Sequence, residues 1–395
     1  MAKGDNVGAP SATQSSPNPA WMGSRWLLFG TAVLLLVLRM PEAVFRAEFW
    51  AEDGLFYGRA LAEGVSTLGD TYAGYFILGI RAVALLETLA PPVLAPAMGN
   101  SVALIIMAAV AAFASSPRMP WDRITGVIIA IGMVLVPIGF ELVGTLIHIV
   151  WPVMLWMGLV AISAEPKTPL GRAIETVGLV VAGLTGIGVV FLLPLFLRGP
   201  RRRLFAVIVT AVIQLATAAL TFADRPGSVG ADWPLVPFVW LQRAVVTPLL
   251  GDTISAVLPV ATIVLVATLV VAIAVVLLLR SPGPVAALIV LLTVAVPLAG
   301  IAAGGEPTAD LTNTAWAPRY FWPAAAGLVI LLAVNRRQWI ALPVIALFVL
   351  GATLEFDIRA APEMGWADRS ACIGGVKPCE IPVAPGDKWN VRWQP

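Results

Sequence analysis

The stretch Ala256–Leu279 reads AVLPVATIVLVATLVVAIAVVLLL and contains no charged residue. The hydrocarbon core of a bilayer is about 30 Å thick, and a helix needs about 20 apolar residues to cross it. A helix satisfies its own backbone hydrogen bonds, which lipid cannot do. This run therefore predicts a membrane-spanning helix.

The composition of the whole chain extends this prediction to most of its length. The 395 residues are 59% hydrophobic and 12% charged, and their mean hydropathy is +0.90. Soluble domains carry about 25% charged residues, so lipid must replace water around most of this surface. The formal net charge of +2, without a basic patch interleaved with aromatic residues, argues against nucleic-acid binding.

Nine apolar runs have spanning length, and two more are ambiguous. The nine are Trp26–Val44, Pro96–Ala114, Ile124–Phe140, Ile149–Ala164, Leu204–Phe222, Ala256–Leu279, Val285–Ala303, Tyr320–Val334 and Ile340–Leu354. Tyr72–Leu89 holds Arg81 and Glu87, and Ala173–Leu197 is interrupted by GLTGIG and Pro194. The sequence predicts an all-α polytopic membrane protein with about eleven transmembrane helices.

The Arg- and Lys-bearing connectors distinguish two topologies, because such connectors favour the cytoplasm. They are the segments 115–123, 165–172, 198–203, 280–284 and 335–337. All are cytoplasmic if Tyr72–Leu89 lies in the interface or re-enters and Ala173–Leu197 is a broken pair of short helices. The rival topology makes each run a single span and puts the first two connectors outside. We favour the first topology.

The ends of the chain differ in character from its centre. Residues 1–24 are rich in Ser, Pro, Ala and Gly and are interpreted as a disordered cytoplasmic tail. Residues 25–356 form the predicted transmembrane domain, and residues 357–395 form a short exported tail. Cys372 and Cys379 stand in this tail, and the oxidising side of the membrane favours a disulfide between them.

A cluster of acidic and aromatic residues follows the first apolar run, in FRAEFWAEDGLFYGRAL (Phe45–Leu61). Glu52 and Asp53 are adjacent, so they cannot share one helical face, and a glycine follows them. Bulky residues such as Trp50 flank the pair, which indicates a turn that directs one carboxylate into a partly dry groove. Desolvation draws the pKa of a carboxylate toward neutrality, so one of the pair is a predicted general base. We favour Asp53.

A second group of candidates lies in FELVGTLIHIVWPVMLW. Glu141 ends a predicted span, where acidic residues are functional candidates. His148 is the single histidine of the chain, which argues against a zinc site. It is either a hydrogen-bonded structural residue or a contact to a substrate hydroxyl or phosphate.

A third group lies in TNTAWAPRYFWP (Thr312–Pro323), where Arg319 and Tyr320 begin a predicted span. Arg319 departs from the cytoplasmic bias of the other cations, although an arginine here also snorkels toward headgroups. A guanidinium offers a rigid fork of donors that matches phosphate oxygens, so Arg319 is a predicted phosphate ligand. Arg243, in WLQRAVVTP, is a weaker candidate of the same kind.

These motifs resemble bacterial GT-C-type glycosyltransferases, which are integral-membrane enzymes. The likeness rests on WAEDGLFYGRAL, the spacing from Glu141 to Trp151, GLTG followed by FLLPLFLR, APRYF and CEIPVAPGDKW, and it extends from Trp26 onward. The acidic first outer loop, with its interfacial helices, is the most specific element. Where other members carry Asn before the aromatic residue of the second motif, this chain has His148.

The resemblance implies a location and a reaction. The chain would lie in the bacterial cytoplasmic membrane, with its N-terminus cytoplasmic and its C-terminus periplasmic or extracellular. It would transfer a sugar, with inversion, from a polyprenyl-phosphate donor to a glycan or glycolipid acceptor at the outer face. No cofactor is implied, and a divalent metal is left open.

The same resemblance gives roles to individual residues. Asp53 or Glu52 would deprotonate the acceptor hydroxyl. Arg319, helped by Arg243 or His148, would offset the charge that develops on the leaving polyprenyl phosphate. The aromatic residues that would stack on sugar faces include Trp50, Tyr72 and Tyr75.

The main rival function is transport or flipping of a lipid-linked precursor. A transporter predicts titratable residues near the bilayer midplane and pseudo-symmetric halves. In this sequence the polar residues gather on one side and no repeat is visible. A second rival function is that of a non-catalytic membrane scaffold, in which the acidic residues would be ordinary interfacial charges. We favour the enzyme over both alternatives.

Overall fold

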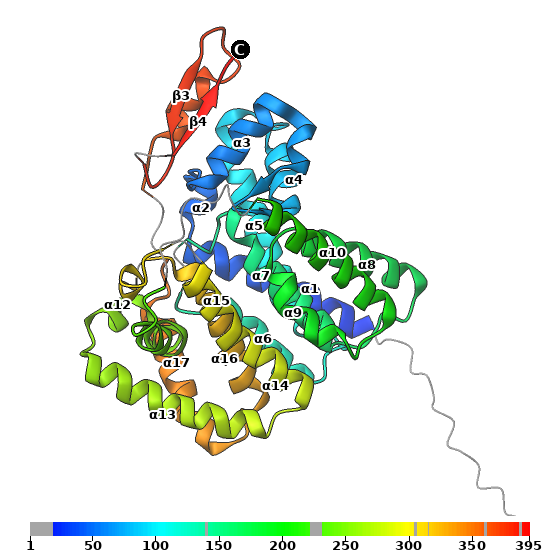
Figure 1. Ribbon diagram of the computed structural model, residues 1–395, viewed down its shortest axis with the longest axis vertical. Helices are drawn as coiled ribbons and strands as arrows, with labels where there is room; N and C mark the ends of the chain where they lie inside the picture. The colour runs from blue at the N-terminus through cyan, green and yellow to red at the C-terminus, as the bar shows by residue number, and fades with distance from the viewer. Residues whose placement is uncertain are drawn as a thin grey trace, which may run out of the picture.

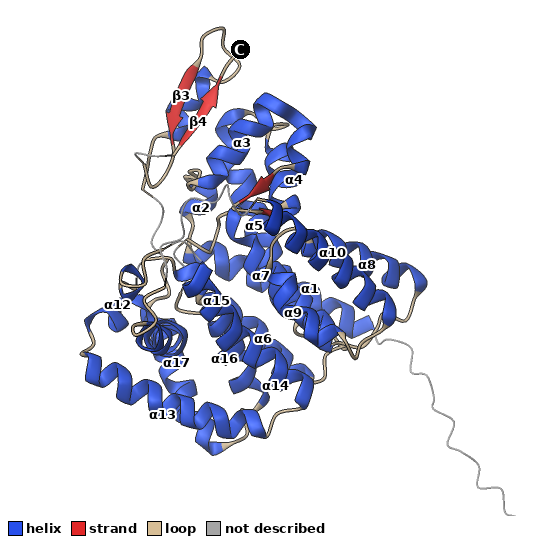
Figure 2. Cartoon of the chain, in the orientation of Figure 1, coloured by secondary structure: helices blue, strands red, loops and turns tan. Residues whose placement is uncertain are grey.

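The computed structural model describes residues 19–138, 141–221, 231–303, 306–314, 316–358, 362–386 and 389–395, which are mostly helical (Figure 1 and Figure 2). The longer helices are α1 (Pro19–Arg39), α3 (Glu52–Glu63), α4 (Leu78–Glu87), α5 (Ala95–Phe113), α6 (Arg123–Leu135), α7 (Val150–Ile162), α8 (Pro169–Gly183), α9 (Gly188–Phe196), α10 (Arg201–Leu220), α12 (Thr247–Val257), α13 (Val260–Leu279), α16 (Trp322–Val334) and α17 (Leu342–Leu354).

Shorter helical segments connect or extend these helices. The α-helical ones are α2 (Glu42–Phe45), α11 (Val236–Trp240), α14 (Gly283–Val290), α15 (Val296–Ala303) and α18 (Trp366–Arg369). The tighter 3₁₀ turns are η1 (Gly64–Gly69), η2 (Pro92–Leu94), η3 (Ile147–Ile149), η7 (Asp310–Thr312), η8 (Pro318–Tyr320), η9 (Trp339–Ala341) and η10 (Ser370–Cys372). Two π-helical segments, η5 (Leu241–Val246) and η6 (Leu291–Ala295), complete the set.

Two small antiparallel hairpins interrupt the helical architecture. The first pairs β1 (Thr71–Tyr72) with β2 (Tyr75–Phe76) and sets Tyr72 opposite Tyr75. The second pairs β3 (Cys379–Pro382) with β4 (Asn390–Trp393) near the C-terminus.

Four helical stretches are long and apolar enough to cross a membrane, as judged by length and composition. They are Pro92–Phe113, Arg201–Leu220, Val260–Leu279 and Gly283–Ala302. Shorter apolar helices cover Arg123–Leu135, Ile147–Ile162, Pro318–Val334 and Trp339–Leu354. The chain thus has the helical architecture of a membrane protein, but the predicted count of about eleven spans was wrong for the residues that are described.

The count was too high because helices end before their apolar runs do. In the run Ile124–Phe140, α6 stops at Leu135, and Val136 leaves the helical conformation with φ −49° and ψ 126°. Pro137 follows, and a proline disfavours the α conformation in the residue before it. The 13 residues of α6 extend only about 20 Å, at about 1.5 Å per residue. Hydrophobicity alone does not reveal such early ends.

The two ambiguous runs have the local structure that the favoured topology requires. Ala173–Leu197 is divided between α8, which ends at Gly183, and α9, which begins at Gly188. Tyr72–Leu89 contains parts of a hairpin and the ten-residue α4, which is too short to cross a bilayer. Of the predicted tail 1–24, residues 1–18 lie outside the described part, and α1 already begins at Pro19.

Side-chain contacts bring the five basic connectors together at one end of the molecule, which we call the connector end. Arg202 forms an ion pair with Glu165 at 2.9 Å, and Arg118 donates to the carbonyl of Ala164 at 2.7 Å. Arg336 pairs with Asp122 at 2.9 Å. Segment 280–284 joins the group because Asn335 donates to the hydroxyl of Ser281 at 3.0 Å. The rival topology separates connectors that the structure holds in contact.

The described residues of the segments 42–95, 141–149, 306–320 and 362–395 meet at another part of the molecule, which we call the loop end. The helix ends beneath it are joined by Arg39, the last residue of α1, which is 2% exposed. Its guanidinium donates to the carbonyls of Val136 at 3.1 Å, Glu355 at 3.2 Å and Phe356 at 2.9 Å. Carbonyls at helix C-termini lack partners within the helix, and Arg39 supplies donors to them.

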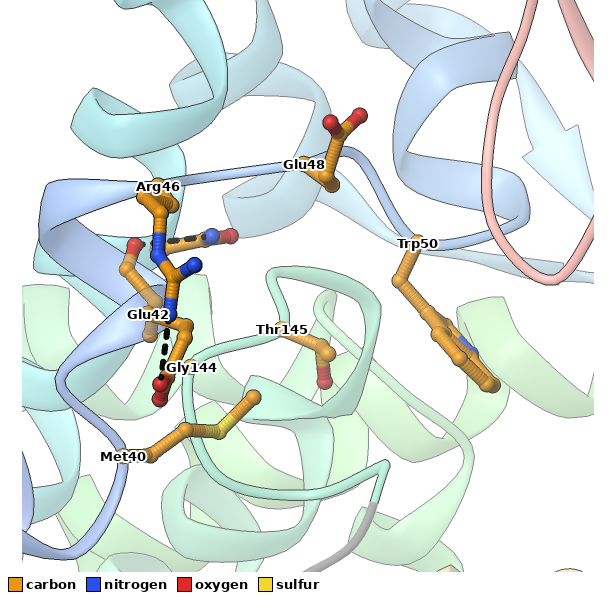
Figure 3. Close-up of a pocket in the computed structure, with 9 residues that line it drawn as sticks. Met40, Glu42, Arg46, Glu48, Trp50, Gly144 and Thr145 are labelled. Carbon is orange, nitrogen blue, oxygen red and sulfur yellow. Dashed lines mark hydrogen bonds and ion pairs between the residues drawn. The ribbon is translucent and has the colours of Figure 1, made fainter. Parts of the chain in front are cut away.

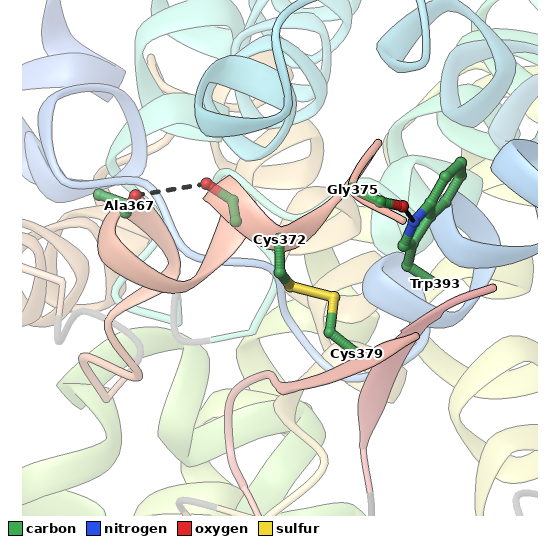
Figure 4. The surroundings of a disulfide bond; sticks show 6 residues. Ala367, Cys372, Gly375, Cys379 and Trp393 are labelled. Atoms are coloured by element: carbon green, nitrogen blue, oxygen red, sulfur yellow. Dashed lines mark hydrogen bonds between the residues drawn. A yellow bond between two sulfur atoms is a disulfide. The ribbon is translucent and has the colours of Figure 1, made fainter. Parts of the chain in front are cut away.

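The C-terminal hairpin lies against α3, at the top of Figure 1. Gly54 of α3 allows this close approach, because a Cβ at this position would lie only 3.0 Å from the Val383 side chain. A disulfide joins Cys372 to Cys379, as the sequence predicted (Figure 4).

Candidate functional site

Arg319 is the centre of a cluster of charged side chains at the loop end. Its Nη1 donates to Glu141 Oε2 at 2.7 Å, and its Nη2 donates to Glu306 Oε1 at 3.4 Å. The Arg319 side chain keeps 21% of its surface exposed. The Tyr320 ring supports the guanidinium, whose carbon lies 4.9 Å from the ring centroid. Arg319 is therefore held in position and is still partly open to a ligand.

Arg243 positions the loop that precedes Arg319. It is fully buried, and its guanidinium donates to the carbonyls of Leu311 at 3.5 Å, Trp316 at 2.8 Å and Asn313. The π-helical segment η5 places Arg243 under this loop. Backbone carbonyls therefore accept from both terminal nitrogens of Arg243, whose contacts support this loop.

Glu141 reaches Arg319 from a tight turn in segment 141–148. Its φ of 66° lies in the left-handed region, which is uncommon for a residue with a side chain. The Thr145 hydroxyl and His148 Nδ1 both contact the Glu141 carbonyl, and they lie 2.7 Å from each other. Burial raises the pKa of Glu141, and the Arg319 guanidinium opposes that rise. His148 is 5% exposed and organises this turn.

Glu52 approaches the same cluster from α3. Its Oε1 accepts a hydrogen bond from the Tyr72 hydroxyl at 3.1 Å, and Glu52 is half-buried. Burial and the Glu52 charge raise the pKa of Tyr72, while Arg319 opposes the rise. The Arg319 charge therefore acts on Tyr72, and we group Tyr72, Glu52 and Arg319 in one candidate site. We call Glu52, Tyr72, Glu141, Glu306 and Arg319 the carboxylate–arginine cluster.

Asp53 points into the protein, toward the backbone of Leu146 and Ile147. It is 1% exposed, and its Oδ2 and Oδ1 accept the backbone N–H groups of Leu146 at 2.9 Å and Ile147 at 2.7 Å. These N–H groups stand at the start of η3 and α7, where helical donors lack partners within the helix. Ala51, at φ 40°, sets the direction in which α3 begins. Both Asp53 oxygens are thus engaged in joining two segments, which disfavours our choice of Asp53 as the base.

Substitution of Asp53 is expected to change stability and its pH dependence. Burial raises the pKa of Asp53 to about 8 from an ordinary value of 3.8, so the folded protein binds the extra proton between these values. Stability then falls as the pH rises through this window. We expect Asp53→Asn to flatten the slope and to cost about 1–3 kcal/mol, because its amide cannot accept from both N–H groups.

Thermal unfolding in detergent at several pH values between about 5 and 8 tests this expectation. The matched control is Asp368→Asn, an exposed carboxylate on α18. An Asp53→Asn protein with the wild-type pH slope would contradict the burial argument.

The predicted aromatic contacts lie around the cluster at different depths. Tyr320 is half-buried, and its ring meets Trp151 edge to face at a centroid distance of 6.0 Å. Tyr75 is half-buried opposite Tyr72 in the first hairpin. Trp50 is 8% exposed and pairs through its backbone with Ala384 of the C-terminal tail. Tyr320 and Tyr75 thus remain accessible in part, whereas Trp50 is mostly covered.

A small hollow of about 20 Å³ adjoins this region (Figure 3). Trp50, Glu48 and Thr145 line it together with the Glu42–Arg46 ion pair, whose atoms are 3.2 Å apart. A water molecule fits in such a volume, but a sugar does not. The hollow is therefore a place for ordered solvent beside the site.

The sequence reasoning missed Glu306 as a site residue, and it expected Tyr72 to stack on a sugar and not to bind a carboxylate. Glu306 follows two glycines in the loop before Arg319, and its Oε2 also accepts from Trp316 Nε1 at 3.0 Å. Tyr72 was grouped with other aromatic residues, but its hydroxyl is the partner of Glu52. A carboxylate in the same loop as the exceptional Arg319 was a signal in the sequence for Glu306. The Tyr72 hydrogen bond had no such signal.

Within the described ranges, His, Cys, Asp and Glu side chains do not gather in groups of three or more that could hold a metal ion. The cluster instead combines a guanidinium, three carboxylates and a phenol, which bind anions and exchange protons. No family model, curated protein or solved structure matches this chain.

Proposed function

We propose that this protein is a membrane glycosyltransferase that takes a sugar from a polyprenyl-phosphate donor. The observation that carries the proposal is the partly exposed Arg319, which Glu141 and Glu306 hold in position and whose charge acts on the hydrogen-bonded Tyr72–Glu52 pair. One site then offers a cation for a phosphate and a carboxylate for a hydroxyl proton. The apolar helices supply a surface for a lipid-linked donor.

In this proposal Glu52 replaces Asp53 as the general base. Glu52 is half-buried and accepts a hydrogen bond from the Tyr72 side chain, whereas both oxygens of Asp53 accept backbone hydrogen bonds. Glu52 takes the proton of the acceptor hydroxyl, and the resulting oxygen attacks the anomeric carbon. The bond from that carbon to the phosphate oxygen breaks with inversion, and the polyprenyl phosphate leaves with the electron pair.

Arg319 offsets the negative charge that develops on the leaving phosphate. A guanidinium has five N–H donors, and the two carboxylate contacts leave others for phosphate oxygens. Because Glu141 and Glu306 fix the guanidinium before substrate binds, little reorganisation is needed when charge develops. Arg243 acts by holding the preceding loop, and His148 acts by holding the Glu141 turn.

The proposal includes a location and a topology. The connector end faces the cytoplasm, in agreement with the positive-inside rule, and the loop end faces the exported side of a bacterial cytoplasmic membrane. The acceptor is a glycan or glycolipid of the cell envelope. The shorter apolar helices complete the transmembrane domain beside the four longer ones. The disulfide of the tail fits an oxidising compartment.

Reconstitution into liposomes tests the reaction against the rival flippase. The purified protein receives a polyprenyl-phosphate sugar labelled in the sugar, with oligosaccharide acceptors on the same side of the bilayer. We expect labelled oligosaccharide and free polyprenyl phosphate in equal amounts. Movement of the intact labelled lipid to the other leaflet, without new oligosaccharide, would instead identify a flippase.

A further inference from the structure

An open groove of about 460 Å³ lies between α3 and the C-terminal hairpin. Leu55, Arg59 and Glu63 of α3 line one wall. Trp389, Arg392 and Gln394 are among the residues that line the other wall. Binding sites for small ligands commonly measure about 300–1,000 Å³, so the groove is large enough for more than one sugar unit.

The α3 wall of the groove is fixed by ion pairs and by close packing. Arg59 Nη2 lies 3.1 Å from Glu63 Oε2 and 3.0 Å from Asp70 Oδ2. The helix packs closely on the chain near β4, because a Cβ at Gly54 would lie only 3.0 Å from the Val383 side chain. The guanidinium and carboxylate on this wall are therefore oriented before a ligand arrives, which reduces the entropy lost on binding.

The hairpin wall is held in a similar way. The disulfide closes the loop that precedes β3, and Trp393 Nε1 of β4 donates to the Gly375 carbonyl at 3.1 Å (Figure 4). Arg392 pairs with Glu380 of the neighbouring strand at 3.2 Å. The Trp389 ring, next to β4, is half-buried. The two walls thus form a built groove rather than a chance gap between surfaces.

The lining has the chemistry of a saccharide site. Trp389 offers an apolar face with a polar edge, while Arg392 and Gln394 offer planar hydrogen-bonding groups. Donors and acceptors are mixed, and the positive charges of the arginines are balanced by neighbouring carboxylates. Nucleic acid requires a predominantly basic surface, and an apolar helix requires a predominantly apolar one. Sugars present hydroxyl groups together with an apolar ring face, which this lining matches.

The groove is aligned with the proposed base. An α-helix has about 3.6 residues per turn, so Glu52 and Arg59, seven residues apart, lie on nearly the same side of α3 and about 10 Å apart along its axis. Asp53 is rotated by about 100° from this side. A linear molecule that lies along the groove past Arg59 therefore has its end directed toward Glu52.

We propose that the groove binds the acceptor as a linear saccharide chain and directs its terminal hydroxyl toward Glu52. This inference rests on the proposed function. It adds that the acceptor is a polymer, because the groove contacts units remote from the one that reacts. Binding energy from remote units lowers the KM of long acceptors and leaves a single sugar unaffected.

Binding and transfer are measured separately to test the inference. The probes are linear oligosaccharides of one to six units, built from mannose, glucose, galactose or arabinose. Saturation-transfer NMR with Glu52→Gln protein in nanodiscs measures binding without turnover. The variants are Trp389→Ala and Arg392→Gln, with Trp389→Phe as the conservative form and Lys377→Gln as an exposed control in the same tail.

We expect one oligosaccharide series to bind more tightly with length and to lose at least about tenfold in affinity in Trp389→Ala. In the active protein, Trp389→Ala raises the KM of long acceptors by a similar factor. Trp389→Phe and Lys377→Gln keep the wild-type values.

The outcomes distinguish the groove from the reaction. Transfer that is independent of acceptor length and insensitive to Trp389→Ala and Arg392→Gln overturns the groove while the glycosyltransferase function stands. Saccharide binding that Trp389→Ala abolishes, in a protein that transfers no sugar, supports the groove and overturns the function. Failure of every oligosaccharide to bind overturns the inference.

Discussion

Glu52→Gln is expected to lower the rate of sugar transfer by about 10²–10⁴-fold, which is the usual contribution of a general base. The amide keeps the size of the side chain and can still accept the Tyr72 hydrogen bond, but it cannot take up the proton of the acceptor. Binding of the donor and the folded structure are expected to persist. The measurement is single-turnover transfer of labelled sugar in liposomes, with the melting temperature recorded in parallel.

Two carboxylates near Glu52 give matched controls. Glu42→Gln removes an acid whose partner is Arg46 at 3.2 Å, and it should leave the rate unchanged. Asp53→Asn should act mainly through stability, because Asp53 holds the start of η3. If Asp53→Asn folded normally and lost transfer while Glu52→Gln kept it, the base would be Asp53 as the sequence suggested.

Arg319→Ala is expected to lower kcat/KM for the polyprenyl-phosphate donor by about 10²–10³-fold, similar to the loss of one preorganised charge contact in other active sites. Arg319→Lys should restore part of the loss, because an ammonium keeps the charge but lacks the planar fork. The KM for the acceptor should change little. Steady-state rates at varied donor and acceptor concentrations separate these effects.

The Arg319 variants should remain folded. Burial already raises the pKa of Glu141, so this carboxyl can take up a proton when its partner is removed and avoid a buried charge. Arg46→Ala, which breaks the Glu42 pair on the surface, is the matched arginine control. If the Arg319→Ala protein had wild-type kinetics with the donor, the proposal that Arg319 binds the donor phosphate would be contradicted.

Much of the architecture could be predicted from the sequence, because helices surrounded by lipid need apolar side chains and these are visible in the composition. The apolar runs located the helices, and the connectors located the end where Arg118, Arg202 and Arg336 gather. The number of spans was predicted less well. Helix ends depend on local features such as Pro137 and the break between Gly183 and Gly188, to which averaged hydrophobicity is insensitive.

The sequence predicted many of the residues of the site but not the contacts between them. The pairing of Glu141 with Arg319 joins residues 178 positions apart, and no local pattern specifies such a contact. Arg243 carried the same functional expectation as Arg319, yet burial and three backbone carbonyls give it a supporting role. The chemistry of a side chain can be inferred from its type, whereas its exposure depends on the neighbours that packing provides.

The adjacent acids Glu52 and Asp53 show where the sequence alone reaches its limit. The sequence determined that two carboxylates on neighbouring positions of a helix point in different directions, because successive residues are rotated by about 100°. Only the tertiary structure decided which direction faces the cluster. The backbone N–H groups of Leu146 and Ile147, more than 90 residues away, donate hydrogen bonds to Asp53. The Tyr72 hydroxyl donates a hydrogen bond to Glu52. Those partners come from packing between distant segments, which local sequence does not encode.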